Sequence, residues 1–331
     1  MRYLNEADIR QIGIDWKKLA AVITEAADAY AKGECAQPLK PYLKFGDASN
    51  RIIAMPAYVA KPQRAAGLKW IASYPGNIAA GLPRAHSVTV LNDPDTGEPI
   101  AMIRGGLISA IRTAAVSGAL LLALLSSRAR LAGSSRPVEA AIIGMGPIGR
   151  THAQMLNALF GEGEIARLRL YDRRDIDREA WSDSSLSRIP VERVSTWQEA
   201  YRESDLILTC TASAERYIDE APSKPGSILM HVSLRDYMSE ALAGAGAVIV
   251  DDWQEVCRAD TDIERLHLEQ SLQAADTVAL AEALSQPDAV VASAGERPIL
   301  FAPMGLAVFD VAVAAYYAAA AEQLGIGKLL D

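Results

Sequence analysis

Hydrophobic and polar positions follow a mixed pattern in the first third of the chain. Apolar residues recur at helical spacing after Asp15, a good N-cap residue, and Gly33 is placed to end that helix. Short apolar runs bounded by turn residues come next and predict strands over 39–45, 51–59, 66–74, 87–92 and 99–103. We therefore expect a helix followed by a mostly antiparallel sheet.

The pattern changes in the middle of the chain. A long apolar helix begins at Leu107 and leads to a polar stretch at 126–137, which we interpret as a hinge between domains. Strands and helices then alternate, which is typical of a parallel sheet. The predicted strands cover 138–143, 168–171, 206–211, 227–232 and 247–250. A nearly apolar last helix, 307–324, follows a short strand at 298–301 and is expected to pack on the first domain or on a partner subunit.

Composition adds limits to this picture. Half of the 331 residues are hydrophobic and 22% are charged, as in ordinary globular proteins. The net charge of -8 offers no overall field for nucleic acid or anionic membranes, so an anionic ligand needs a local pocket. Three well-separated cysteines and a charged N-terminus without an export signal predict a cytoplasmic protein. Arg112 argues for burial of the helix at 107–125 rather than for a membrane span.

A glycine motif marks a nucleotide site. The pattern G-x-G-x-x-G directly follows an apolar strand and opens a helix, and it comprises Gly144, Met145, Gly146, Pro147, Ile148 and Gly149. Such a loop lets backbone amides and a helix N-terminus approach a pyrophosphate. Asp172 ends the next strand, 23 residues after the last glycine, where a ribose-binding acid is expected. These features predict a Rossmann domain; a structural glycine turn is the alternative.

The same region favours NAD over NADP. A carboxylate at Asp172 would repel a 2′-phosphate, although Arg173 and Arg174 follow it and could pair with one. The segment Thr211, Ala212 and Ser213 ends a later predicted strand, where the cofactor crevice should run, or it is an ordinary polar loop.

Basic residues in apolar surroundings are the candidate substrate ligands. Lys69 lies in a strand-like run and Arg112 in an apolar helix, so each either pairs with an anion or has a structural role. Lys40 is less distinctive, and without further information it would be interpreted as an ordinary surface lysine. His231 interrupts an apolar strand and either contacts a ligand or is a hydrogen-bonded core histidine. No residue spacing suggests zinc or a serine nucleophile, so chemistry must come from a cofactor and these cations.

Taken in order, the motifs resemble the ornithine cyclodeaminase/mu-crystallin family along the whole chain. The resemblance rests on Ala54-Met55-Pro56-Ala57, Gly67-Leu68-Lys69, the turn at 92–97, Arg112-Thr113-Ala114-Ala115, the glycine loop and the segment 300–305. Within the family, the segments 38–43, 51–58, 69–77 and 232–236 are most similar to dehydrogenases that make 2,3-diaminopropionate for siderophores and peptide antibiotics.

The resemblance implies an α/β fold with a Rossmann NAD-binding domain over 126–302. A discontinuous α+β domain, formed by 1–125 and 303–331, would bind substrate and form a homodimer. It also implies an active site between the two domains and a cysteine-synthase-like, PLP-dependent enzyme as pathway neighbour. No nucleic acid or membrane partner and no metal is expected.

The resemblance also assigns residues. Lys69 matches the active-site lysine, Arg112 the carboxylate-binding arginine, and Lys40 stands where cyclodeaminases have a substrate-binding arginine. Cyclodeaminases carry a catalytic aspartate in a V-G-A-D segment, whereas this chain has Asp236 displaced by one position and preceded by Arg235. We expect Asp236 to act in catalysis. The resemblance further places His231 and Arg235 at the substrate, and Ser233, Met304 and Gly305 at the cofactor.

The expected reaction is NAD-dependent oxidation of N-(2-amino-2-carboxyethyl)-L-glutamate, followed by hydrolysis to 2-oxoglutarate and 2,3-diaminopropionate. Lys69 would act either as a base or only as an anchor for a carboxylate. The alternatives are ornithine cyclodeamination or ketimine reduction within the same family, and a non-catalytic binding protein of the mu-crystallin type.

Overall fold

The computed structural model describes residues 1–47, 49–133, 136–174, 176 and 186–331. The chain divides into two compact units, each described here by itself. Unit 1 comprises Met1–Val116 and Gly305–Asp331, and unit 2 comprises Ser117–Met304. The division between Val116 and Ser117 falls inside helix α3 (Gly106–Ala132). This helix also continues through the first part of the polar stretch 126–137.

Unit 1 is built on a seven-stranded sheet with the order β15-β1-β6-β5-β4-β3-β2. All neighbouring strands are antiparallel except β1 and β6, as the short turns in the sequence predict. Its strands are β1 (Arg2–Leu4), β2 (Tyr42–Leu43), β3 (Arg51–Val59), β4 (Ala65–Ser73), β5 (Ala85–Asn92), β6 (Pro99–Arg104) and β15 (Lys328–Leu329). The prediction of a strand over 39–45 was too long, since only two of its residues pair.

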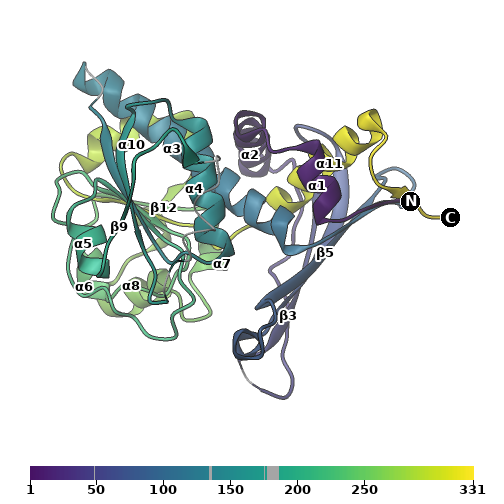
Figure 1. The fold of residues 1–331 in the computed structure, drawn as a ribbon, viewed down its shortest axis with the longest axis horizontal. Helices are drawn as coiled ribbons and strands as arrows, with labels where there is room; N and C mark the ends of the chain where they lie inside the picture. The colour runs from purple at the N-terminus through teal and green to yellow at the C-terminus, as the bar shows by residue number, and fades with distance from the viewer. Residues whose placement is uncertain (48, 134–135, 175, 177–185) are drawn as a thin grey trace. The chain divides into compact units, whose positions relative to one another are not determined.

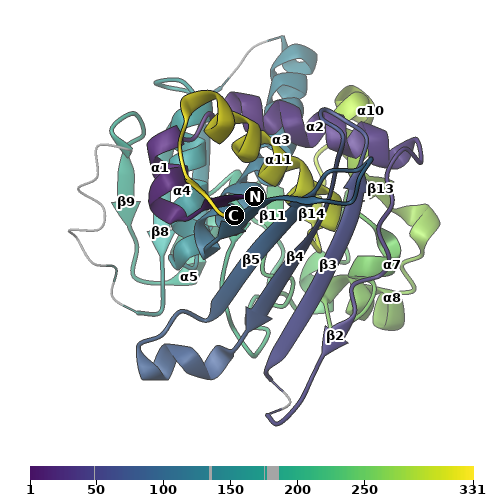
Figure 2. The ribbon, with the colours of Figure 1, turned by 90° about the vertical axis from the view of Figure 1, so that its right-hand side faces the viewer.

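Three α-helices lie wholly within the described part of unit 1: α1 (Glu6–Ile12), α2 (Trp16–Ala31) and α11 (Ala307–Leu324). Asp15 caps α2 by accepting a hydrogen bond from the backbone of Lys18, as predicted. Helix α11 contacts α2 and strands β3, β4 and β5, so the final apolar helix packs within unit 1. Figure 2 shows the long strands of this sheet side by side, with the two termini close together.

Unit 2 contains an eight-stranded sheet in which every pair is parallel, with the order β13-β12-β14-β11-β10-β7-β8-β9. Its strands are β7 (Val138–Ile143), β8 (Ile165–Tyr171), β9 (Val191–Arg193), β10 (Leu206–Thr209), β11 (Ile228–His231), β12 (Ala247–Val250), β13 (Val278–Ala279) and β14 (Ile299–Ala302). The run β9-β8-β7-β10-β11 has the strand order 3-2-1-4-5 of a doubly wound sheet, which confirms the predicted α/β fold.

Helices lie on both sides of this parallel sheet (Figure 1). They are α4 (Pro147–Leu159), α5 (Trp197–Arg202), α6 (Ser239–Leu242), α7 (Trp253–Val256), α8 (Asp262–Gln270), α9 (Leu280–Ser285) and α10 (Pro287–Ala294). Because both faces are covered, the strands β10, β11, β12 and β14 are buried at every position.

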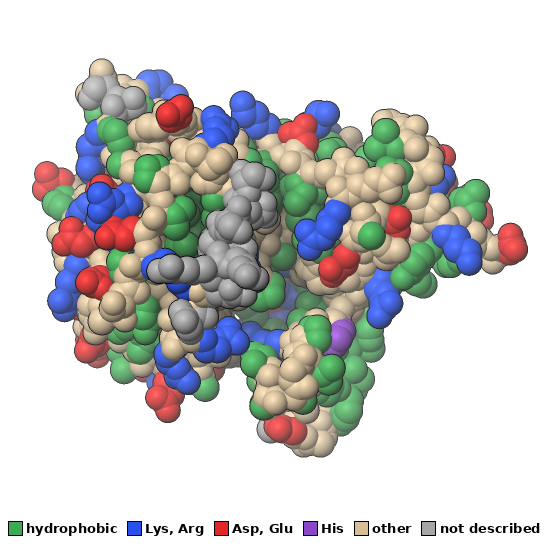
Figure 3. Space-filling model, in the orientation of Figure 1, with side chains coloured by type: hydrophobic (Ala, Val, Ile, Leu, Met, Phe, Trp, Pro, Cys, Tyr) green, Lys and Arg blue, Asp and Glu red, His purple; other side chains and the backbone are tan. Residues whose placement is uncertain are grey.

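Helix α3 is long and apolar enough to cross a membrane by length and composition. However, 72% of its most apolar window is buried inside the protein. This burial is typical of a core helix, as Arg112 indicated. The described residues on the face shown in Figure 3 include both acidic and basic side chains.

Candidate active site

The glycine loop of unit 2 joins β7 to α4 and leaves room beside its second glycine. Gly144 has φ of 99°, and a Cβ there would lie 2.7 Å from the backbone of Cys210. A Cβ on Gly149 would lie 2.0 Å from the carbonyl oxygen of Gly144, so the first and third glycines are required for packing. A Cβ on Gly146 would meet nothing within 4 Å. This open position is where a pyrophosphate approaches the helix N-terminus in dinucleotide sites, so the loop fits such a cofactor.

Asp172 follows β8 and is tied to the glycine loop. One carboxylate oxygen accepts a hydrogen bond from the backbone of Met145 at 2.8 Å, and the other accepts one from the backbone of Arg174 at 2.9 Å. The Arg174 guanidinium lies 3.6 Å from the same carboxylate, whereas Arg173 is exposed. The predicted ribose-binding acid is thus held beside the predicted pyrophosphate loop.

Two of the three hydroxyl groups predicted to bind the cofactor, those of Thr211 and Ser233, share one acceptor. Thr211 follows β10, Ser233 follows β11, and both donate a hydrogen bond to the carboxylate of Asp236. Ser233 also donates to the carbonyl oxygen of Thr209 at 3.0 Å, and Ser213 donates its backbone N–H to Thr211 at 3.2 Å. The carboxyl ends of two neighbouring strands are therefore joined through Asp236.

Asp236 itself has no exposed surface. Burial raises the pKa of its carboxyl group, which the nearby His231 opposes. In this structure the carboxylate accepts hydrogen bonds from Thr211 and Ser233 and so joins the two strand ends. Its catalytic role stays a prediction.

His231 is a hydrogen-bonded core histidine in this structure, and its predicted contact with substrate stays a prediction. Its side chain is fully buried, with Nδ1 2.8 Å from the Thr209 hydroxyl and Nε2 2.7 Å from Asp262. Asp262 also accepts backbone hydrogen bonds from Asp236 and Tyr237. The alternative of a hydrogen-bonded core histidine, which the sequence left open, is the one that the geometry supports.

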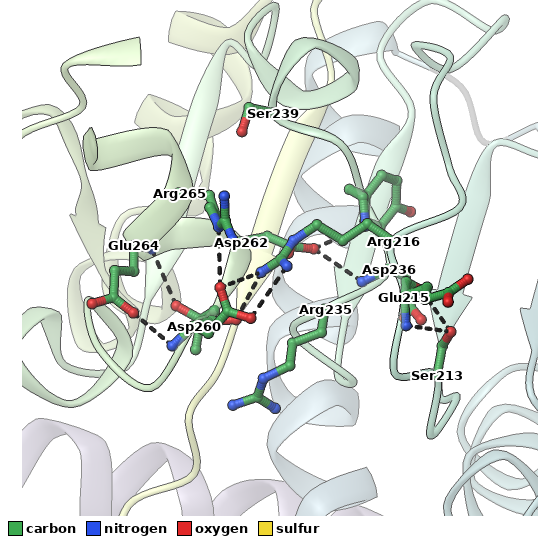
Figure 4. Close-up of polar contacts among 12 residues, drawn as sticks. Ser213, Glu215, Arg216, Arg235, Asp236, Ser239, Asp260, Asp262, Glu264 and Arg265 are labelled. Atoms are coloured by element: carbon green, nitrogen blue, oxygen red, sulfur yellow. Dashed lines mark hydrogen bonds and ion pairs between the residues drawn. The ribbon is translucent and has the colours of Figure 1, made fainter. Parts of the chain in front are cut away.

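Arg216 completes this network from a loop that the sequence did not single out. Its Nε donates to Asp262 at 2.7 Å, and its guanidinium also contacts Asp260 (Figure 4). Arg235 lies on the same loop as Asp236, but its side chain points away from these ion pairs and donates to the carbonyl oxygen of Ala259 at 2.7 Å. Its assignment to the substrate stays a prediction.

Unit 1 brings the three predicted substrate cations to one buried cluster. Lys69 on β4 donates to the hydroxyl of Ser109 at 2.8 Å and to Asp310 at 3.0 Å. Arg112 on α3 donates its Nε to the same oxygen of Asp310 at 2.8 Å. Lys40 donates to the carbonyl oxygen of Gly305 at 2.8 Å. A Cβ on Gly305 would lie 2.6 Å from the Arg112 guanidinium, so the backbone at this glycine adjoins two of the cations.

Asp310 is a site residue that the sequence analysis missed. It is 4% exposed and lies on α11, where it is an acid in an otherwise apolar first turn. That isolated acid was the available signal, since a carboxylate in an apolar helix needs a cationic partner. Its Oδ2 is buried and has no hydrogen-bond partner among the described residues. This oxygen remains as an acceptor for a ligand or a water molecule.

The cluster carries a net positive charge. Lys40, Lys69 and Arg112 contribute three cations against the one anion of Asp310, which gives 3 − 1 = +2 with all groups ionised. The pKa of Lys69 is lowered to about 8. Burial is the largest cause, and Arg112 and Lys40 lower the pKa as well, whereas Asp310 raises it. Burial opposes the ionisation of Asp310, but Arg112 and Lys69 together hold its pKa below the usual value. The arrangement suits a carboxylate ligand and a lysine that can exchange a proton near neutral pH.

The last predicted cofactor residues lie where unit 2 ends. The backbone N–H of Met304 donates to Asp251 at 3.0 Å. Gly305 belongs to unit 1, where it accepts from Lys40, and its contact with a cofactor stays a prediction. Within the described ranges, no group of three or more His, Cys, Asp or Glu side chains could hold a metal ion.

Comparison with known proteins agrees with this geometry. The chain is 32% identical to N-((2S)-2-amino-2-carboxyethyl)-L-glutamate dehydrogenase from Staphylococcus aureus, with 100% of this chain and 98% of that protein covered. It superimposes on Thermococcus litoralis Delta(1)-pyrroline-2-carboxylate reductase in complex with NADH and L-proline, with a TM-score of 0.85, 24% identity and full coverage of both chains. An archaeal alanine dehydrogenase dimer with bound NAD gives a TM-score of 0.80 at 23% identity, covering 100% and 99% of the two chains. The family model for ornithine cyclodeaminase/mu-crystallin proteins matches residues 6–323, and the chain belongs to this family.

Proposed function

We propose that the protein is an NAD-dependent oxidoreductase that acts on the C–N bond of N-(2-amino-2-carboxyethyl)-L-glutamate. The balanced reaction consumes this amine, NAD⁺ and water, and yields 2-oxoglutarate, 2,3-diaminopropionate, NADH and a proton. The product would serve siderophore or peptide biosynthesis in the cytoplasm. The proposal is supported by the full-length similarity to the Staphylococcus aureus dehydrogenase.

The observation that carries the proposal is the buried cluster of Lys40, Lys69 and Arg112 around Asp310. Buried cations in excess of acids are stabilised by an anionic ligand. The proposed substrate has three carboxylates, and its secondary ammonium could donate to the free acceptor Oδ2 of Asp310. A ligand with several carboxylates and one amine therefore matches the charges of the cluster.

Unit 2 supplies the residues that would hold NAD. The backbone amides of the glycine loop would bind the pyrophosphate and Asp172 the adenosine ribose, while Thr211 and Ser233 lie at the strand ends where the crevice should run. When bound, NAD accepts a hydride from the carbon of the C–N bond. Asp172 supports NAD over NADP, because a 2′-phosphate would meet its carboxylate.

Lys69 is proposed to accept the proton of the substrate ammonium. Deprotonation makes the nitrogen lone pair available, and removal of the hydride then yields an imine, to which water adds before the C–N bond breaks. A lysine with a pKa of about 8 is partly deprotonated near neutral pH and can return the proton later. Arg112 would hold the carboxylate beside the reacting carbon and so orient that carbon.

A homodimer is also proposed, formed through the face of the unit 1 sheet opposite to Lys69. Because side chains alternate along a strand, Trp70 points away from the Lys69 face, and it is 40% exposed. The archaeal alanine dehydrogenase of similar fold is a dimer, which supports the proposal. A cysteine-synthase-like enzyme that forms the substrate is the proposed pathway neighbour.

The test of the function measures NADH at 340 nm with the proposed substrate and, separately, with L-ornithine. Formation of NADH, 2-oxoglutarate and 2,3-diaminopropionate, identified by mass spectrometry, is the expected result. Proline and ammonia from ornithine would instead identify a cyclodeaminase, and absence of turnover with both would favour ketimine reduction or ligand binding alone.

Three variants test the role of Lys69. We expect Lys69→Met and Lys69→Arg to lose activity by about a hundredfold or more, because neither side chain can accept a proton near neutral pH. An anchoring role would instead leave Lys69→Arg active. Lys61→Met is the matched control, because Lys61 is an exposed lysine of the same unit that pairs with Glu34.

A further inference from the structure

Arg51 lies on the same sheet face as Lys69. Strands β3 and β4 are antiparallel, and their register pairs Arg51 with Ser73, Ile53 with Ile71 and Met55 with Lys69. Side chains two residues apart share a face, so Arg51 and Lys69 project to the same side of the sheet. This is the side on which α11 presents Asp310 to Lys69.

The separation between these cations suits a ligand with more than one anionic group. Arg51 is four residues along β3 from Met55, the partner of Lys69, which corresponds to roughly 13 Å of strand. Both side chains are long, so their charged ends can approach each other more closely than their backbones do. A ligand with one carboxylate cannot use both positions, whereas a carboxylate several bonds from the reacting carbon could reach the second.

Arg51 also has unused hydrogen-bonding capacity. Its Nε is buried and has no hydrogen-bond partner among the described residues. Its guanidinium carbon lies 5.5 Å from the centre of the Tyr42 ring, which faces the same side because Tyr42 pairs with Ile53. Stacking on an aromatic ring orders an arginine while leaving its edge donors available for a planar carboxylate.

We infer that Arg51 binds a carboxylate of the substrate other than the one beside the reacting carbon. The inference rests on the proposed function, because it assigns the cluster at Lys69 and Arg112 to the first carboxylate. It makes Arg51 a specificity-determining residue: the site would favour amines with several carboxylates over ornithine, alanine or proline, each of which has one.

The test measures binding to the NADH-loaded enzyme by calorimetry, so that no turnover occurs. The ligands are N-(2-amino-2-carboxyethyl)-L-glutamate and two analogues in which one or the other remote carboxylate is replaced by an amide. We expect Arg51→Gln to weaken binding of the triacid by about 10- to 100-fold, and Arg51→Lys to weaken it less. One of the amide analogues should bind Arg51→Gln and wild type equally, because the partner of the arginine is then already missing.

Arg64→Gln is the matched control, since Arg64 is an exposed arginine of the same unit that pairs with Asp95. Unchanged binding of NADH and an unchanged circular dichroism spectrum establish that each variant is folded. Equal losses for the triacid and for both amides in Arg51→Gln would overturn the inference, as would unchanged binding of the triacid.

The outcome for the proposed function is separate. Wild type that binds the triacid but does not oxidise it with NAD⁺ would refute the function and leave the role of Arg51 standing. Wild type that oxidises the triacid, with Arg51→Gln binding it normally, would refute only the inference. Absence of both binding and oxidation in wild type would overturn both.

Discussion

Replacement of Asp310 by asparagine tests how the buried cluster sets the protonation of Lys69. Asparagine keeps an oxygen that can accept from Lys69 and from Arg112, so the contacts can persist while the negative charge is lost. The pKa of Lys69 is about 8 because burial lowers it and Asp310 only partly compensates. Without that charge, the pKa of Lys69 should fall further.

The size of the effect follows from the distance between the charges. At 3.0 Å from Lys69, a unit charge contributes about 5 kcal/mol at an effective dielectric constant of about 20. That energy is roughly 4 pKa units and is an upper bound. Single neighbouring charges usually shift a pKa by about 1 to 3 units, so we expect a decrease in this range.

The assay is the dependence of kcat/KM for the amine substrate on pH with saturating NAD⁺, because this ratio reports the pKa values of the enzyme before that substrate binds. If Lys69 must be neutral to accept a proton, kcat/KM of the wild type rises as the pH passes about 8. In Asp310→Asn, this rise should move to lower pH by about 1 to 3 units. The variant Asp288→Asn is the control, because Asp288 is half exposed and pairs with Arg130 elsewhere in the chain. A rise that stays in place, or that moves to higher pH, would refute the assignment of the titration to Lys69.

Two further changes address the cofactor unit. Asp172→Ser should increase kcat/KM with NADP⁺ relative to NAD⁺ by about tenfold or more, measured at 340 nm, because the carboxylate that would repel a 2′-phosphate is removed; an unchanged ratio would show that Asp172 does not select the cofactor. Asp262→Asn should lower the free energy of unfolding in urea by about 3 kcal/mol, since it leaves the Arg216 guanidinium without its buried partner. A decrease below about 1 kcal/mol would show that this network is not important for stability.

Local patterns explain why so much of the fold was predictable. The strands β3, β7 and β12 were predicted with their observed bounds, because continuous apolar runs and flanking turn residues are local properties of the chain. The glycine loop was equally accessible, since the structure shows steric reasons for glycine at Gly144 and Gly149 and open space at Gly146. Short elements such as β9 and β13 were missed because two or three residues carry no periodicity.

The partners of the site residues were less predictable because they are distant in the sequence. Asp310 is 241 residues from Lys69 and 198 from Arg112, and no sequence pattern connects them. The same holds for His231, whose partner Asp262 lies 31 residues away in another element. A single sequence shows that a polar residue interrupts an apolar run, but the fold decides whether that residue meets a ligand or another buried group.

The surroundings of Asp236 bear on the choice between family activities. The resemblance placed the catalytic acid of cyclodeaminases in the segment that here contains Arg235 and Asp236. In this chain the displaced carboxylate is buried and accepts from Thr211 and Ser233, while the residue before it is a cation. Cyclisation in the family pattern uses the acid of this segment, whereas here that carboxylate is already engaged by two hydroxyls of its own unit. We therefore take this departure from the family pattern to favour the proposed oxidation of the triacid over cyclisation of ornithine.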